Sequence, residues 1–124
     1  MNNVFNDFET STKNTNSFLK NSYLISKVSH TDTLNIIRKQ VIKIVMSFLG
    51  IKDVKDENNF LNNIHKVIKK NDVNNLRLHV YNEINKIDWF RPSYFNLGKD
   101  KIFELVGNEL AMQSKINVSI QMPN

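Results

Sequence analysis

The sequence predicts an α+β fold, in which a mainly helical layer is followed by the first strand or strands of a β-sheet. Along most of residues 31–106, apolar residues recur at spacings of three and four, which is typical of amphipathic helices. Near the carboxyl end the pattern changes to strict alternation of apolar and polar residues, which indicates a half-buried strand. With 124 residues, 40% of them hydrophobic, the chain corresponds to one domain at most.

The first part of the chain predicts little regular structure. Residues 1–15 are polar and small, and we expect a loose leader there. Residues 16–124 are expected to form a single partial domain. Within it, the stretch SYLISKV at 22–28 is rich in β-branched and aromatic residues, which predicts a short strand.

The clearest helix is predicted over residues 31–49. Its apolar stripe consists of Leu34, Ile37, Val41, Ile44, Val45 and Phe48. Thr31, Asp32 or Thr33 is expected to cap its amino end. Gly50 stands where a helix commonly ends in the left-handed conformation.

Further helices are predicted over 56–70, 72–87 and 92–106. Their opposite faces are polar, so we expect them to cover another layer. Pro92 is compatible with the first turn of the last helix, because its missing N–H has no partner there anyway. Gly98 weakens that helix by about 1 kcal/mol relative to alanine.

The final strand is predicted over residues 109–121. Here Ile116, Val118 and Ile120 alternate with the polar residues Asn117, Ser119 and Gln121. Paired only with 22–28, this strand would form a two-stranded sheet, which is marginal in water. We therefore expect more sheet beyond residue 124. The uncharged polar residues are compatible either with a solvated face or with the wall of a cavity that binds a polar ligand.

Few residues suggest chemistry. His30-Thr31-Asp32 matches the H-x-D motif of non-haem iron sites, and His79 lies downstream. We favour helix capping for this tripeptide, so no catalytic and no metal-binding residue is predicted. Trp89-Phe90-Arg91 can form a sugar or anion site, although the favoured interpretation is a turn whose Trp and Phe rings fill the core while Arg91 pairs with a carboxylate. The absence of cysteine excludes disulfides and thiolate metal sites.

The net charge of +5 does not predict a nucleic-acid partner. The lysines are spread along the chain, and asparagine makes up roughly one residue in six, so a biased composition explains the charge better than a basic patch does. No apolar run reaches the roughly 20 residues that span a bilayer. We expect a cytoplasmic protein with no membrane partner.

One stretch resembles a known family. WFRPSYFNLGKDKIFELVGNELAMQSKINVSIQMPN (89–124) resembles the iron(II)/2-oxoglutarate-dependent dioxygenases of the phytanoyl-CoA dioxygenase type, within them the bacterial branch found in carbohydrate biosynthesis clusters. The earlier stretch SFLKNSYLISKVSHTDTLNIIRKQV (17–41) is similar to the opening of that superfamily. Residues 51–88 match nothing in it.

The resemblance implies an amino-terminal fragment of an oxygenase with a double-stranded β-helix (jelly roll) flanked by helices. Fe(II) and 2-oxoglutarate would be the cofactors of the full-length parent, and a sugar or sugar-containing intermediate its substrate. In the family, the H-x-D, the distal histidine and the 2-oxoglutarate-binding arginine follow the segment that KINVSIQ resembles. No residue here therefore carries over as a metal ligand.

Candidate site residues follow from these observations. The resemblance implies that Asn117, Ser119 and Gln121 face the cofactor cavity, and Trp89 and Arg91 are candidates for binding the substrate. The alternative interpretation is a complete small helical protein-interaction module with no enzymatic activity, whose binding surface includes Trp89-Phe90-Arg91. A basic nucleic-acid-binding module is a third, less favoured option. The oligomeric state is not predicted.

Overall fold

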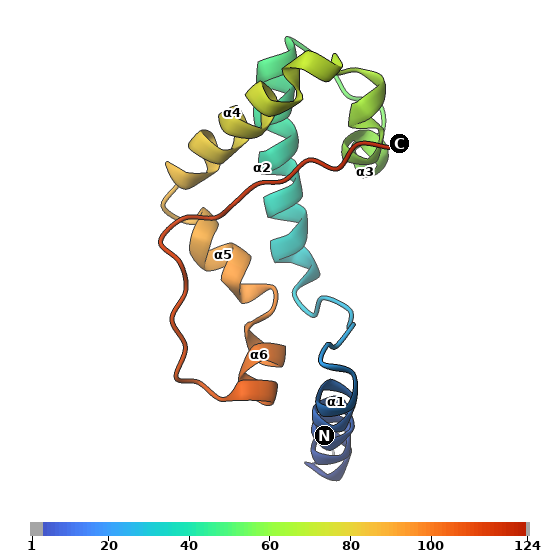
Figure 1. The fold of residues 1–124 in the computed structure, drawn as a ribbon, viewed down its shortest axis with the longest axis vertical. Coiled ribbons are helices and arrows are strands. Elements are labelled where there is room, and N and C mark those ends of the chain that lie inside the picture. The colour runs from blue at the N-terminus through green and yellow to red at the C-terminus, as the bar shows by residue number, and fades with distance from the viewer. Residues whose placement is uncertain (1–3, 124) are drawn as a thin grey trace.

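The protein is an assembly of helices around one central helix. A computed structural model describes residues 4–123, with side chains from Lys13 onward. The elements, shown in Figure 1, are α1 (Val4–Asn21), α2 (Thr31–Leu49), α3 (Glu57–Phe60), two 3₁₀ turns (Leu61–Lys66 and Lys70–Asp72), α4 (Val73–Asn85), α5 (Phe90–Asn96) and α6 (Lys99–Val106). None of the helices described is long and apolar enough to cross a membrane.

Helix α2 is the centre of the fold. Helices α3, α4 and α5 all pack against it, and α4 crosses its upper part in Figure 1. The core combines the apolar faces of these helices with residues of the loops and of the carboxyl end, namely Ile37, Ile44, Val45, Ile64, Ile68, Leu76, Val80, Ile84, Phe90 and Ile116. These helices therefore form one packed unit, whereas α1 packs against α6 at the far end of the molecule.

Helix α2 has the bounds that its apolar stripe predicts. Gly50 lies in the left-handed region (φ 68°), and its N–H donates to the carbonyl of Met46, so the helix ends there. The predicted cap is wrong, because His30 is the N-cap residue and makes no capping hydrogen bond through its side chain. Asp32 lies in the first turn, where a carboxylate complements the helix dipole.

The α+β prediction is wrong. No strand occurs among residues 4–123, so the predicted first strands of a jelly roll are absent from the part of the chain that the structure describes. Residues 23–28 and 109–121 lack regular secondary structure and pair with no strand. The physical reason is that alternation of apolar and polar residues predicts an extended chain with one buried face. It does not predict whether another strand is hydrogen-bonded to the backbone of that chain. Here the buried face lies on helices, which offer no ladder of hydrogen bonds.

Three other boundaries differ from the sequence prediction. Most of the expected leader over 1–15 belongs to α1, although residues 1–3 lie outside the described part. The helix expected over 56–70 is a single α-helical turn followed by 3₁₀ turns. The helix expected over 92–106 begins earlier and is interrupted at Gly98, so α5 and α6 are separate.

Two leucines on α4 provide a test of the core. The Leu76 side chain is 1% exposed, whereas Leu78, two residues along the same helix, is 41% exposed. We predict that Leu76→Ala lowers the free energy of unfolding by about 2–5 kcal/mol, because it leaves a cavity between α4 and its neighbours. Leu78→Ala is expected to change it by about 0.5 kcal/mol or less. Urea unfolding followed by circular dichroism measures both, and equal effects would contradict this core.

Candidate functional site

The candidate site is built on the carboxyl-terminal part of the chain. After α6, residues 107–123 run as one irregular, largely extended stretch, which we call the extended segment. In Figure 1 it turns back from α6, passes the end of α4 where α5 begins, and crosses α2 toward α3. Between residues 108 and 123, no backbone group is hydrogen-bonded to another backbone group of the described chain. Side chains of the helices hold it instead.

Asn85, the last residue of α4, makes the first of these attachments. Its Oδ1 accepts a hydrogen bond from the N–H of Ile116 at 2.8 Å, and its Nδ2 donates to the carbonyl of Ile116 at 2.9 Å. The same Nδ2 donates to the carbonyl of Tyr81, one turn back in α4, at 2.8 Å. One amide side chain therefore pairs with both backbone groups of Ile116, as a neighbouring strand would do.

Arg91 makes the second attachment, from the first turn of α5. Its Nε donates to the carbonyl of Gln113 and its Nη2 to the carbonyl of Met112, both at 2.7 Å. Hydrogen bonds from a charged guanidinium are stronger than those between neutral groups. Arg91 was predicted either to bind substrate or to pair with a carboxylate. The described structure instead directs two of its nitrogens to backbone carbonyls of the extended segment, so the carboxylate prediction is wrong.

The predicted alternation appears as alternate burial. Ile116 is 7% exposed, and Val118, Ile120 and Met122 pack against the helical core. Asn117, Ser119 and Gln121 are all exposed on the other side, and we call them the polar row. Gln121 Nε2 donates to Ser119 Oγ at 2.9 Å. The structure therefore brings the three candidate cofactor-binding residues together on one side of the chain.

Trp89, the other candidate for binding substrate, lies at the start of α5. It is 42% exposed, its ring centroid is 5.8 Å from that of Phe90, and Phe90 is buried at 2% exposure. Both rings were predicted to be buried in the core. This prediction is confirmed for Phe90 but not for Trp89. Nothing in the sequence marks Asn85, because one asparagine among so many gives no signal.

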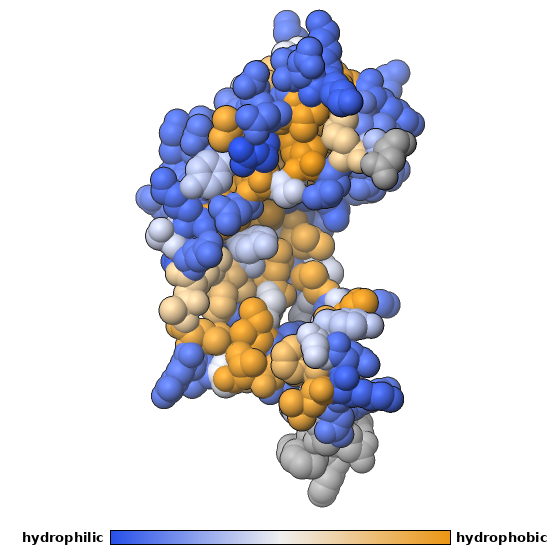
Figure 2. Space-filling view, viewed as in Figure 1, coloured by the Kyte–Doolittle hydropathy of each residue, from blue (hydrophilic) through white to orange (hydrophobic). Residues whose placement is uncertain are grey.

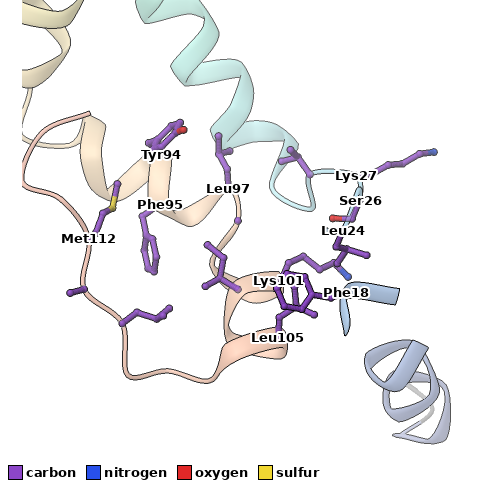
Figure 3. Close-up of a pocket in the computed structure, with 15 residues that line it drawn as sticks. Phe18, Leu24, Ser26, Lys27, Tyr94, Phe95, Leu97, Lys101, Leu105 and Met112 are labelled. Carbon is purple, nitrogen blue, oxygen red and sulfur yellow. The ribbon is translucent and has the colours of Figure 1, made fainter. Parts of the chain in front are cut away.

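A large apolar cavity was also missed. It is a pocket of about 660 Å³ that is widely open to solvent. Figure 3 shows its lining, which comes from the end of α1, the loop before α2, α5, α6 and the start of the extended segment. Apolar residues also gather over α5 and α6 in Figure 2. Neither Trp89, Arg91 nor the polar row lines it. Because its walls come from distant segments, no local pattern could reveal it.

The histidines do not form a metal site with the residues described. His30 Nε2 lies 2.9 Å from Asp100 Oδ2, so this ring links the start of α2 to α6. The ring of His79 packs against that of Phe48, with the centroids 5.4 Å apart and the ring planes tilted by 39°. Among the side chains described, those of residues 13–123, no group of three histidine, aspartate or glutamate residues is placed to hold a metal ion.

The chain was compared with known protein families, curated proteins and solved structures. No protein-family model, curated protein or solved structure matches this chain.

The two bonds from Arg91 can be tested by proteolysis. Lys115 is exposed in the extended segment, and trypsin can cleave after it only when the segment opens locally. We predict that Arg91→Ala accelerates this cleavage about tenfold, because two charged hydrogen bonds are lost. Arg77→Ala is the matched control, since Arg77 bonds only to Asn74 of its own helix among the described residues. An unchanged cleavage rate in Arg91→Ala would contradict the attachment.

Proposed function

We propose that this chain is the helical, amino-terminal part of a non-haem iron(II)/2-oxoglutarate-dependent oxygenase that acts on a sugar or a sugar-containing intermediate. The substrate class and the reaction rest on the family that residues 89–124 resemble. The proposal assigns the polar row to the binding of 2-oxoglutarate, and it places the enzyme in the cytoplasm. A chain without cysteine fits that reducing compartment.

The observation that supports the proposal is the side on which the polar row lies. Asn117, Ser119 and Gln121 are exposed together, while the residues between them pack against helices. The row contains no lysine or glutamate, the residues that commonly cover a solvated face. Hydrogen-bonding groups without charge are suited to orienting a polar ligand in a cavity.

The chemistry of the row suits an anionic co-substrate. The amide groups of Asn117 and Gln121 and the hydroxyl of Ser119 can all donate to carboxylate oxygens. Because Gln121 already donates to Ser119 Oγ, the hydroxyl proton of Ser119 is left to point elsewhere. Donors to an ionised group form the stronger class of hydrogen bond, so two or three of them would orient 2-oxoglutarate.

The iron itself does not fit the residues present. The side chains of residues 13–123 offer no set of three ligands, and His30 is hydrogen-bonded to Asp100. The proposal therefore assigns the metal ligands to sequence outside this chain, as the resemblance implies, and attributes no step at the metal to any residue here. What this chain would contribute is a rigid helical support and one wall of the co-substrate site.

Reading the coding DNA past codon 124 tests the assignment directly. The proposal expects an H-x-D motif within a few dozen codons, followed later by a histidine and an arginine. An immediate stop codon would overturn it.

A substitution in the polar row tests its role in the gene product that contains this chain. We predict that Gln121→Ala raises KM for 2-oxoglutarate about tenfold, because one hydrogen bond to a charged ligand is lost. Gln113→Ala is the matched control, since Gln113 is an exposed glutamine of the same segment and the substitution keeps its carbonyl bond to Arg91. Turnover of 2-oxoglutarate measures both. Equal KM values in the two variants would contradict the assignment of the polar row to 2-oxoglutarate binding.

A helical protein-interaction module is the second candidate, and the apolar cavity favours it. Four of its lining residues are exposed large apolar side chains, namely Val28, Tyr94, Ile102 and Leu110. Apolar side chains at an open pocket are the kind of surface that accepts an anchor from a partner.

An exposed isoleucine at the cavity tests this candidate. We predict that Ile102→Glu abolishes capture of a specific partner by the immobilised chain, because a carboxylate would be desolvated in the contact. Ile36→Glu serves as the control, because Ile36 is exposed on α2 and does not line the cavity. If both variants still captured the partner, the cavity would have no role in partner binding.

A further inference from the structure

We infer that the partner bound at the apolar cavity is an acidic amphipathic helix. Its apolar side chains fill the cavity, and its carboxylates face the lysines at the end of α1 and in the loop before α2. The inference rests on the second candidate function, because it names the chemistry of the partner that the cavity accepts. It does not depend on the assignment of the chain to an oxygenase.

The first step is the size and lining of the cavity. Its volume of about 660 Å³ is larger than one side chain fills, and it is widely open to solvent. Lys27 and Lys101 are the only charged residues among the described side chains that line it. An amphipathic helix presents several apolar side chains along one face, at spacings of three, four and seven residues, and it lays that face into an apolar groove. The cavity therefore suits a helix better than a single anchoring side chain.

The second step is the apolar rim. Val28, Tyr94, Ile102 and Leu110 line the cavity and are exposed, and Figure 2 shows the apolar surface that continues over α5 and α6. A partner helix would remove this area from water, which favours binding. A nucleic acid binds mainly through its phosphates and would leave the aliphatic side chains without a partner. The rim thus favours a protein segment over a nucleic acid.

The third step is the charge on the wall nearest to α1. Residues 17–28 contain two lysines, Lys20 and Lys27, and no acidic residue. Lys20 lies in the last turn of α1, two residues after Phe18, which lines the cavity. Both lysines are exposed, and Figure 3 shows that Lys27 extends away from the other lining residues. Neither belongs to an ion pair among the described residues.

The acidic residues near the cavity lie elsewhere. Glu104 Oε2 is 3.7 Å from Lys101 Nζ, so these two charges of α6 largely offset each other. Asp100 is hydrogen-bonded to His30 at the start of α2. Glu109 belongs to the extended segment, which begins on the far side of α6 from α1 in Figure 1. The positive charge without a nearby carboxylate is therefore on the α1 side, where a partner's carboxylates are complementary to it.

Binding of designed peptides to the immobilised chain tests the inference. Three peptides of about four helical turns carry the same leucines at helical spacing and differ only at the flanking positions, which are all Glu, all Gln or all Lys. Circular dichroism confirms that their helix contents match. At low salt, we expect the Glu peptide to bind at least about tenfold more tightly than the Lys peptide, and we expect added salt to reduce this ratio. Equal affinities, or no binding of the Glu peptide, would overturn the inference.

Charge reversal on the chain locates the complementary lysines. In the double variant Lys20→Glu/Lys27→Glu, we expect the preference for the Glu peptide to fall at least about tenfold. Lys39→Glu/Lys43→Glu is the matched control, because it changes the net charge equally at two exposed lysines of α2 that do not line the cavity. A preference that persists in the first variant, or that falls equally in both, would contradict the inference.

A third variant separates the chemistry of the partner from the existence of the site. If Ile102→Glu abolishes binding of the peptides while Lys20→Glu/Lys27→Glu leaves their order unchanged, the cavity binds a partner that need not be acidic, and only the present inference falls. If Ile102→Glu leaves the Glu peptide bound as tightly as before, the peptide binds outside the cavity, and the inference is wrong. Equally tight binding of a single-stranded oligonucleotide that displaces the Glu peptide would refute it as well.

Discussion

Every peptide group of an extended chain needs a hydrogen-bond partner, and residues 107–123 run beside helices whose own backbone groups are already paired. The rest of the molecule is arranged around this constraint. Asn85 and Arg91 supply side-chain partners at Ile116, Gln113 and Met112, where the extended segment passes α4 and α5. Between these anchors and beyond them, the segment is held by burying every second side chain.

The helical core makes these anchors precise. Asn85 directly follows Ile84, which is 3% exposed and belongs to the face of α4 that packs toward α2. Arg91 directly follows Phe90, which is buried from the start of α5. Each polar anchor is thus adjacent to a core residue, and the packing of that residue limits how far the anchor can move. The burial that stabilises the fold also determines where the extended segment lies.

The sequence predicted the parts of the fold that depend on local periodicity. The apolar stripe from Leu34 to Phe48 and the glycine after it gave the bounds of α2, because both signals act within a few residues. Alternation near the carboxyl end correctly separated buried from exposed side chains. It did not reveal that helices would be on the buried side, since what packs against a segment is decided by residues far along the chain.

The candidate site was predictable only in part. The polar row followed from the alternation, and the structure places its three members on the same side. The contact of Asn85 spans 31 positions in the sequence, and no spacing rule connects an asparagine at a helix end with a distant isoleucine. Arg91 was singled out because it stands among aromatic residues, yet its partners are carbonyls of the extended segment. The apolar cavity depends on tertiary packing alone.

Asparagine is also a chemically labile residue, prone to lose its side-chain nitrogen on ageing or heating. At position 85 such deamidation would replace the donor toward Tyr81 and Ile116 with a carboxylate oxygen, facing two carbonyl oxygens. A negative charge there repels both, so the damage would be worse than simple truncation of the side chain. A single hydrolysed amide, adding one mass unit to the chain, would thus release the extended segment from α4.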